Sequence, residues 1–252
     1  MRMKFDRVRI TLMAAAGWIL LTLPATASET QTTMTLFNGK DMSGWNAQRT
    51  PSEWMVADSV SLDPNDNKKF AIQAGDGIMV NGAKGNTTNI YSQFEHGDCM
   101  LHIEFVVPKG SNSGVYLQGL YEIQVLDSYG KKDSELEFSD CGGMYARWDD
   151  KAQKSYEGEP PRINASKAPG EWQSFDAVFR APRFDAQGKK IENACFLVVK
   201  HNGVVVHENY EVSGGTRACM NREEGPKGPL MLQGDHGPVA YRNIQITSLN
   251  LK

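Results

Sequence analysis

The sequence predicts an all-β fold, an antiparallel β-sandwich of the jelly-roll type, and three observations lead to it. Short runs rich in β-branched and aromatic residues recur along the chain, and several alternate apolar and polar residues with a period of two. Clusters of Gly, Pro, Asn and Asp separate these runs. No window longer than ten residues carries the apolar stripe of an amphipathic helix. This pattern is typical of a sandwich rather than of a parallel sheet covered by helices.

Eight segments from residue 100 onward are predicted strands. In chain order they are Met100–Val107, Gly114–Gln118, Tyr121–Leu126, Gln173–Arg180, Cys195–Lys200, Val204–Tyr210, Pro229–Gln233 and Val239–Leu249. Asn202–Gly203 joins two of them, and because both residues tolerate positive φ it predicts a tight hairpin. The polar stretch Asp149–Lys167, with Pro160–Pro161 inside it, is expected to be a loop that either carries function or is a plain surface excursion.

The N-terminus predicts a signal peptide over residues 1–27. Four basic residues precede an apolar run from Ile10 to Leu23, and the small residues Ala25–Thr26–Ala27 follow it. The run is shorter than the ~20 residues that span a bilayer, although an uncleaved N-terminal anchor is the alternative. We therefore expect cleavage near Ala27 and a periplasmic or secreted protein. Residues 28–252 are expected to form a single domain without a membrane span.

Charge and cysteine content narrow the classes of partner. The formal net charge is −3 with scattered Lys and Arg, which is a poor match to nucleic acid or to an anionic membrane surface. A neutral sugar needs no charge complement. The spacing of the cysteines does not suggest a zinc site, and in an oxidising compartment two disulfides with three alternative pairings are open. Cys195 lies in an apolar run and reads equally as a buried thiol. The four cysteines are Cys99, Cys141, Cys195 and Cys219.

Three predicted strands are expected to present one polar face. With a period of two, each strand turns one set of side chains toward the core and the other away from it. Carboxylates, amides and a tyrosine ring on one sheet surface suit the hydroxyls and faces of a sugar. An ordinary solvated sheet face is the alternative, although this one contains no Lys. The polar set is Glu104, Tyr116, Gln118, Glu122 and Gln124.

A second candidate feature lies near the C-terminus. Gly228–Pro238 runs from a strand into a turn bracketed by glycines, which carries Asp235 and His236. A histidine in a rigid turn beside an aspartate can act as acid, base or metal ligand, or can be a structural hydrogen-bonding residue. The chain contains neither G-x-S-x-G nor H-E-x-x-H, and the clustered acids of glucanases are also missing. It thus offers no obvious pair of carboxylates ~5 Å apart, as a retaining glycosidase requires.

Six ordered motifs nevertheless resemble one known family. They are LFNGKDMSGW (36–45), GSNSGVYLQG (110–119), YEIQVLDSYG (121–130), NASKAPGEWQSFDAVFRAPRFD (164–185), HNGVVVHEN (201–209) and GPLMLQGDHGPVAYRNIQI (228–246). The chain is similar to the 3-keto-disaccharide hydrolase domain family, formerly a domain of unknown function. The resemblance implies a jelly roll like that of concanavalin A-type lectins and glucanases, with a sugar-facing sheet.

The same resemblance implies a chemistry that needs no pair of acids. A sugar 3-dehydrogenase upstream would oxidise the 3-hydroxyl to a ketone, which acidifies the C2 proton. A base removes that proton, the C1 aglycone leaves, and water adds back. The site then needs a base, a group that stabilises the enolate and a proton donor. The resemblance identifies no cofactor, although a divalent metal ion could stabilise the enolate. A non-catalytic carbohydrate-binding module and a conventional glycosidase are the alternatives.

Roles within this chemistry are assigned to nine residues. Glu122 and His236 are the expected acid and base, and Glu104 is a weaker third candidate. The sugar hydroxyls or the keto oxygen are expected to be held by Asn112, Tyr116, Gln118, Gln124, Gln233 and Arg242.

Overall fold

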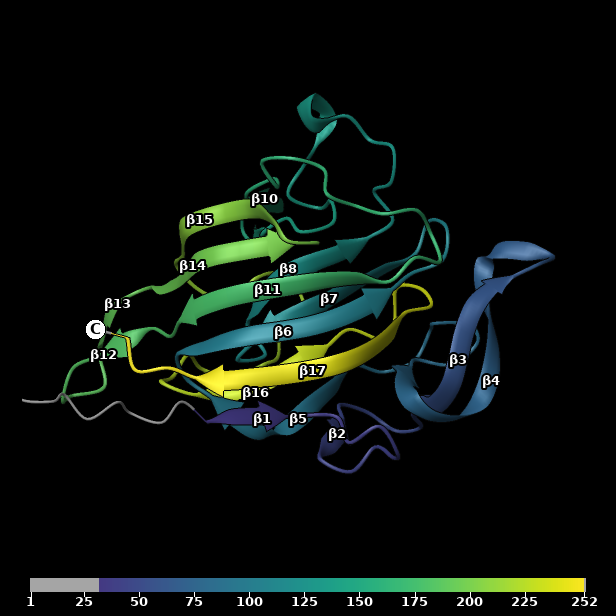
Figure 1. Cartoon of the computed structure of the whole chain (residues 1–252). Coiled ribbons are helices and arrows are strands. Elements are labelled where there is room, and N and C mark those ends of the chain that lie inside the picture. The colour runs from purple at the N-terminus through teal and green to yellow at the C-terminus, as the bar shows by residue number, and fades with distance from the viewer. Residues whose placement is uncertain (1–31, 252) are drawn as a thin grey trace, which may run out of the picture. The chain divides into compact units, whose positions relative to one another are not determined.

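Two antiparallel sheets face each other across one apolar core (Figure 1). The computed structural model describes residues 32–251, so the predicted signal peptide and its cleavage site lie outside the described residues. Strands dominate this part, and the sole regular helical element within it is a 3-10 turn, η1 (Asp133–Glu135). No helix in residues 32–251 is long and apolar enough to cross a membrane. The predicted all-β jelly-roll sandwich is therefore confirmed.

The larger sheet has eight strands. Their bounds are β1 Thr33–Thr35, β3 Met55–Asp63, β4 Asp66–Val80, β6 Cys99–Val106, β11 Gln173–Arg180, β14 Ala194–His201, β15 Val204–Val212 and β17 Ala240–Ser248. Their order is β15–β14–β11–β6–β17–β4–β3, with β1 also paired to β17. Beyond its pairing with β17, β4 continues with β3 as a long hairpin, the blue ribbon at the right of Figure 1.

The smaller sheet has five strands and carries the site described below. It comprises β2 (Trp45–Ala47), β5 (Ile90–His96), β16 (Gly228–Leu232), β7 (Asn112–Leu117) and β8 (Tyr121–Leu126), in that order. Two short ribbons complete the fold, one of β9 (Arg147–Asp149) with β10 (Lys154–Tyr156) and one of β12 (Arg183–Phe184) with β13 (Lys190–Glu192).

Alternating side chains build the core between the sheets. In β11 every second residue is fully buried, and Phe175, Ala177 and Phe179 pack inward. From the other sheet, Ile123 and Val125 of β8 join the same apolar cluster. Burial of one face per strand fixes the register, because a slip of one residue would turn the apolar set to solvent.

The predicted strands all exist, with ends displaced by at most a few residues. Asn202 and Gly203 have φ of 51° and 81° and join β14 to β15, which confirms the hairpin. The hairpin of β3 and β4 had no counterpart among the predicted strands because its residues are largely exposed and polar, so no clean alternation marks it. The stretch Asp149–Lys167, expected to be a loop, contains β10 and forms a ribbon with β9.

All four cysteines are unpaired thiols. Neither of the two disulfides left open by the sequence is formed, whereas the alternative for Cys195, a buried thiol, is confirmed. The core here is large enough to stabilise the fold without cross-links.

Candidate active site

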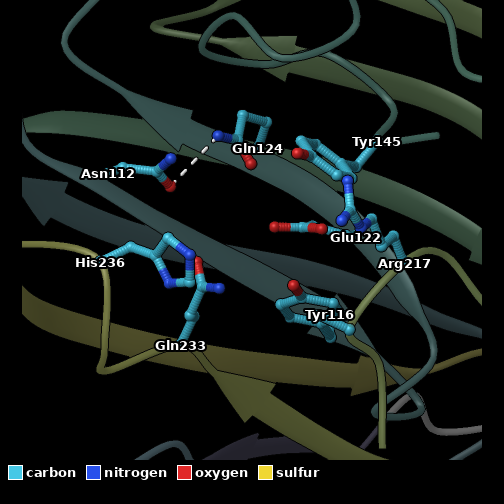
Figure 2. Close-up of a pocket in the computed structure, with 9 residues that line it drawn as sticks. Asn112, Tyr116, Glu122, Gln124, Tyr145, Arg217, Gln233 and His236 are labelled. Carbon is cyan, nitrogen blue, oxygen red and sulfur yellow. Dashed lines mark hydrogen bonds between the residues drawn. The ribbon is translucent and has the colours of Figure 1, made fainter. Parts of the chain in front are cut away.

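A cavity of about 350 Å³ lies over the face of the five-stranded sheet that points away from the core. Strands β7 and β8 form its floor, and the turn after β16 and two loop segments form its walls (Figure 2). Six of the nine predicted site residues meet in it. The lining residues are Asn112, Tyr116, Glu122, Gln124, Tyr145, Arg217, Ala218, Gln233 and His236.

Strand pairing explains why distant positions converge. In the β7–β8 hairpin Tyr116 lies opposite Glu122, and Gly114 lies opposite Gln124. Paired residues point to the same face, so these side chains share the floor of the pocket while Val115 and Ile123 enter the core. Gln124 donates through Nε2 to Oδ1 of Asn112 at 3.2 Å, which links two adjacent amides on the floor (Figure 2).

Glu122 is an acid in an unusual environment. Glu122 is 2% exposed, and its Oε2 has no hydrogen-bond partner in residues 32–251. Burial raises the pKa of Glu122 to about 8, and the neighbouring Tyr116 side chain partly opposes this shift. A carboxyl group that stays protonated near neutral pH can act as a general acid. Buried carboxyl groups with raised pKa values that open into a pocket are frequent at catalytic sites.

Gly114 provides the space that Glu122 occupies. A Cβ at position 114 would overlap Oε1 of Glu122 and lie 2.7 Å from Cε2 of Tyr116. Glycine is thus required by the close approach of two site residues. The motif that contains it, GSNSGVYLQG, did not identify it as a site residue because the contact crosses from β7 to β8.

Replacement of Gly114 by Ala is therefore expected to displace the carboxyl group of Glu122. Overpacking of this kind costs ~1–3 kcal/mol of stability, and misplacement of a catalytic group lowers turnover by at least ~10-fold. Chemical denaturation and turnover measure the two effects. In a Glu122→Ala background the overlap with the carboxyl group is relieved and only the close contact with Tyr116 remains, so the added methyl should cost less stability than it does in wild type. An equal cost in both backgrounds would contradict the assignment.

His236 lies on a turn that is held by hydrogen bonds from a buried side chain. Its Nδ1 is 2.6 Å from Oδ1 of Asp235, so an Nδ1–H donated to that carboxylate leaves the Nε2 lone pair free. The fully buried Asn81 donates through Nδ2 to the carbonyl oxygens of Gly234 and Gly237 at 3.1 and 2.8 Å. Its Oδ1 accepts from the backbone N–H of Val239 at 2.8 Å. One side chain thus clamps both ends of the turn.

Tyr145 and Arg217 line the pocket and are not among the predicted site residues. Tyr145 follows Met144, which bridges Ile123, and its N–H donates to the carbonyl of Glu122 at 3.2 Å. Burial and then the charge of Glu122 raise the pKa of its hydroxyl. The alternation of Met144, Tyr145 and Ala146 in GGMYARW would have indicated an outward tyrosine. Arg217 lies in an irregular loop, where no periodic signal exists.

Three predicted site residues, Glu104, Gln118 and Arg242, lie outside this pocket. Glu104 is on β6 of the other sheet, where it accepts from Arg242 Nε at 2.7 Å and from Asn243 Nδ2 at 2.8 Å. Arg242 also lies 4.0 Å over the ring of Trp172. Burial alone would raise the pKa of Glu104, but the hydrogen bonds from Asn243 and Arg242 hold this pKa below its usual value. Period-two alternation had given Glu104 a polar face without revealing which sheet β6 joins.

Gln118 lies outside the pocket for a different reason. Strand β7 ends at Leu117, and Gln118 adopts φ of 53° in the turn that follows. Its side chain is buried and donates to the carbonyl oxygens of His96 and Pro226 at 3.3 and 3.2 Å. Gln118 therefore ties the turn to neighbouring loops and does not reach the pocket.

The donor set of the pocket does not suit a resident divalent metal. Within residues 32–251 no group of three or more His, Cys, Asp or Glu side chains is arranged to hold one. The lining offers one carboxyl, Glu122, and one imidazole, His236, so most ligands would have to be amide or hydroxyl oxygens. Arg217 is the lining residue with a permanent positive charge.

Comparisons with known proteins agree with this fold. A model of the 3-keto-alpha-glucoside-1,2-lyase-like domain matches residues 32–247. A candidate glycosyl hydrolase of Parabacteroides distasonis is similar in structure, with 28% identity, a TM-score of 0.58, and coverage of 86% of this chain and 84% of that chain. A second candidate glycosyl hydrolase from the same organism has 20% identity and a TM-score of 0.52, and the match covers 86% of this chain and 100% of that chain. No curated protein matches the chain.

Proposed function

Because the chain belongs to the 3-keto-alpha-glucoside-1,2-lyase-like domain family, we propose that it is an enzyme that cleaves 3-keto-glycosides by elimination and hydration. The observation that supports this most directly is the presence in one pocket of a buried carboxyl group, whose Oε2 has no hydrogen-bond partner in residues 32–251, and of an imidazole hydrogen-bonded to Asp235. Amides and tyrosine hydroxyls surround them, as hydroxyl recognition in a sugar requires.

In the first half-reaction His236 is the base. Its Nε2 takes the C2 proton, which the adjacent 3-keto group makes acidic, and Asp235 holds the resulting imidazolium through Nδ1. The electrons move into the ketone to form an enolate, and their return expels the aglycone oxygen from C1. Glu122 gives its proton to that oxygen, because a carboxyl with a pKa of about 8 still carries one at neutral pH.

In the second half-reaction the roles reverse. Glu122, now a carboxylate in a buried site, takes a proton from water as the water oxygen bonds to C1 of the unsaturated keto sugar. His236 returns its proton to C2. The net result is hydrolysis to a 3-keto sugar and a free aglycone, and both residues recover their initial protonation states.

A conventional glycosidase fits the pocket less well. Retaining and inverting mechanisms both use two carboxyl groups beside the scissile bond. Glu122 is the one carboxyl that lines this pocket. The elimination route needs one acid and one base of different types, which is the pair present.

The proposed substrate places the enzyme after an oxidation. A sugar 3-dehydrogenase must supply the ketone, and with the predicted signal peptide we propose that the cleavage takes place in the periplasm or outside the cell. Neutral sugars also agree with a pocket whose lining is mostly amide and hydroxyl.

The deciding experiment compares matched 3-keto and unoxidised aryl glucosides, with and without EDTA. Release of the aglycone from the keto form alone supports the elimination mechanism. Cleavage of the unoxidised form would instead indicate a conventional glycosidase. Saturable binding without cleavage of either would indicate a carbohydrate-binding module. Loss of activity with EDTA would contradict the metal-independent mechanism.

A further inference from the structure

Arg217 is held in the pocket by contacts on both sides of its own backbone. Its N–H donates to the carbonyl of Ala146 at 2.9 Å, and the preceding Thr216 donates through N and Oγ1 to the carbonyl of Leu120 at 2.9 and 3.0 Å. Ala218, the next residue, adopts a φ of +62°. A non-glycine residue in this region is uncommon, and here it turns the backbone immediately after Arg217 at the pocket wall.

The guanidinium group rests on an aromatic ring. Its Cζ lies 4.0 Å over the ring of Trp148, which belongs to β9. Stacking on an indole face restricts the planar group in orientation while leaving its N–H donors in the plane free. The β9–β10 ribbon, which the sequence did not predict, thus supports a cation at the pocket wall.

The charge of Arg217 is not neutralised by a partner. Among residues 32–251 no carboxylate lies within ion-pair distance of it. Glu122 shares the pocket but forms no ion pair with Arg217, and burial keeps its carboxyl protonated near neutral pH. A free cation beside a neutral acid makes the pocket favourable for an anion that forms during the reaction.

We propose that Arg217, stacked on Trp148, is a catalytic residue that binds the 3-keto oxygen of the substrate and stabilises the enolate formed when the C2 proton leaves. This inference rests on the proposed function and assigns the group that elimination needs besides an acid and a base. Tyr145 lines the same pocket beside Arg217 (Figure 2), and its hydroxyl is the second donor that we assign to this oxygen. The guanidinium serves where a Lewis-acidic ion would otherwise be required.

The test separates enolate formation from loss of the aglycone. Methyl 3-keto-glucoside has a poor leaving group, so exchange of its C2 proton for deuterium in D₂O, followed by NMR, reports the enolate directly. Arg217→Met is expected to slow this exchange and the cleavage of an aryl 3-keto-glucoside by ~10²-fold, as for loss of an oxyanion donor, with a small change in KM. The exchange and cleavage rates of Arg217→Lys should lie between those of Arg217→Met and wild type. Added guanidinium ion should restore part of the rate that Arg217→Met has lost.

Arg162→Met is the control, because it removes an exposed guanidinium that pairs with Glu208 away from the pocket. Circular dichroism melts establish that each variant is folded. An exchange rate unchanged in Arg217→Met, or a loss confined to KM, overturns the role of Arg217 while leaving the proposed function intact. If wild-type protein neither exchanges nor cleaves 3-keto-glucosides, both the proposed function and the role of Arg217 are overturned.

Discussion

Replacement of Glu122 by Gln is expected to lower turnover of a 3-keto-glucoside by ~10³-fold, because removal of a positioned general acid costs ~10²–10⁴-fold. Glutamine keeps the shape of the side chain and can donate a hydrogen bond, but it cannot release a proton to the departing oxygen. Binding of the substrate should change little, since the amide fits the same space beside Gly114. Steady-state kinetics with calorimetric binding measure both quantities.

The same residue predicts the alkaline side of the pH profile. Glu122 must be protonated to act as an acid, and its pKa is about 8. Activity should therefore fall as pH rises through about 8, and the Glu122→Gln variant should lose this inflection. Substrates with better leaving groups need less protonation of the departing oxygen, so their activity should fall less at alkaline pH.

Glu104→Gln is the matched control, because it makes the same change on the other sheet. Glu104 is held by Arg242 and Asn243, so its substitution should leave turnover near the wild-type value. Equal loss of turnover in both variants would contradict the assignment of Glu122. Loss of affinity without loss of turnover in Glu122→Gln would favour a binding role.

The Glu122→Gln substitution should raise stability at pH 8 even though it lowers activity. The folded-state pKa of Glu122, about 8, lies above its usual value of 4.5, so between these two pH values the native state holds a proton that the unfolded chain has lost. Stability therefore declines as pH rises across this window. The Gln variant cannot ionise, so it should melt at a higher temperature than wild type at pH 8 and at a similar one at pH 4.

Replacement of His236 by Gln in the wild-type protein is expected to lower turnover by ~10³-fold, because glutamine cannot accept the C2 proton. Exchange of the C2 proton should fall in parallel with cleavage, since both need the same base. Asp235→Asn should cause a smaller loss, because the imidazole remains but its orientation and its positive form are less well supported.

His102→Gln controls for this change. On the eight-stranded sheet, Nδ1 of His102 lies 2.7 Å from Oδ1 of Asp176, which reproduces the His–Asp contact outside the pocket. This variant should retain turnover. If His236→Gln still exchanged the C2 proton at the wild-type rate, the base would have to be another group.

Local pattern predicted much of the site, and the limits of that pattern explain the errors. Tyr116, Glu122 and Gln124 follow the period of two on adjacent strands, so their convergence could be predicted. Glu104 obeys the same period, but alternation does not say which sheet a strand joins. Arg217 was beyond prediction, because its position depends on hydrogen bonds from an irregular loop to residues remote in the sequence.

The hydrogen bonds of Asn81 to the His236 turn also make the site sensitive to hydrolysis of one side-chain amide. Asn81 precedes Gly82, and an Asn–Gly pair is the dipeptide in which side-chain amides hydrolyse most readily. In the native state its amide is buried and bonded at both Nδ2 and Oδ1, which protects it from the backbone attack that begins hydrolysis. Once the chain has unfolded and the amide has become a carboxylate, two donors are replaced by a negative charge facing two carbonyl oxygens. A thermally cycled sample should then refold with an intact core and a displaced base, and so accumulate protein that still holds sugar but no longer turns it over.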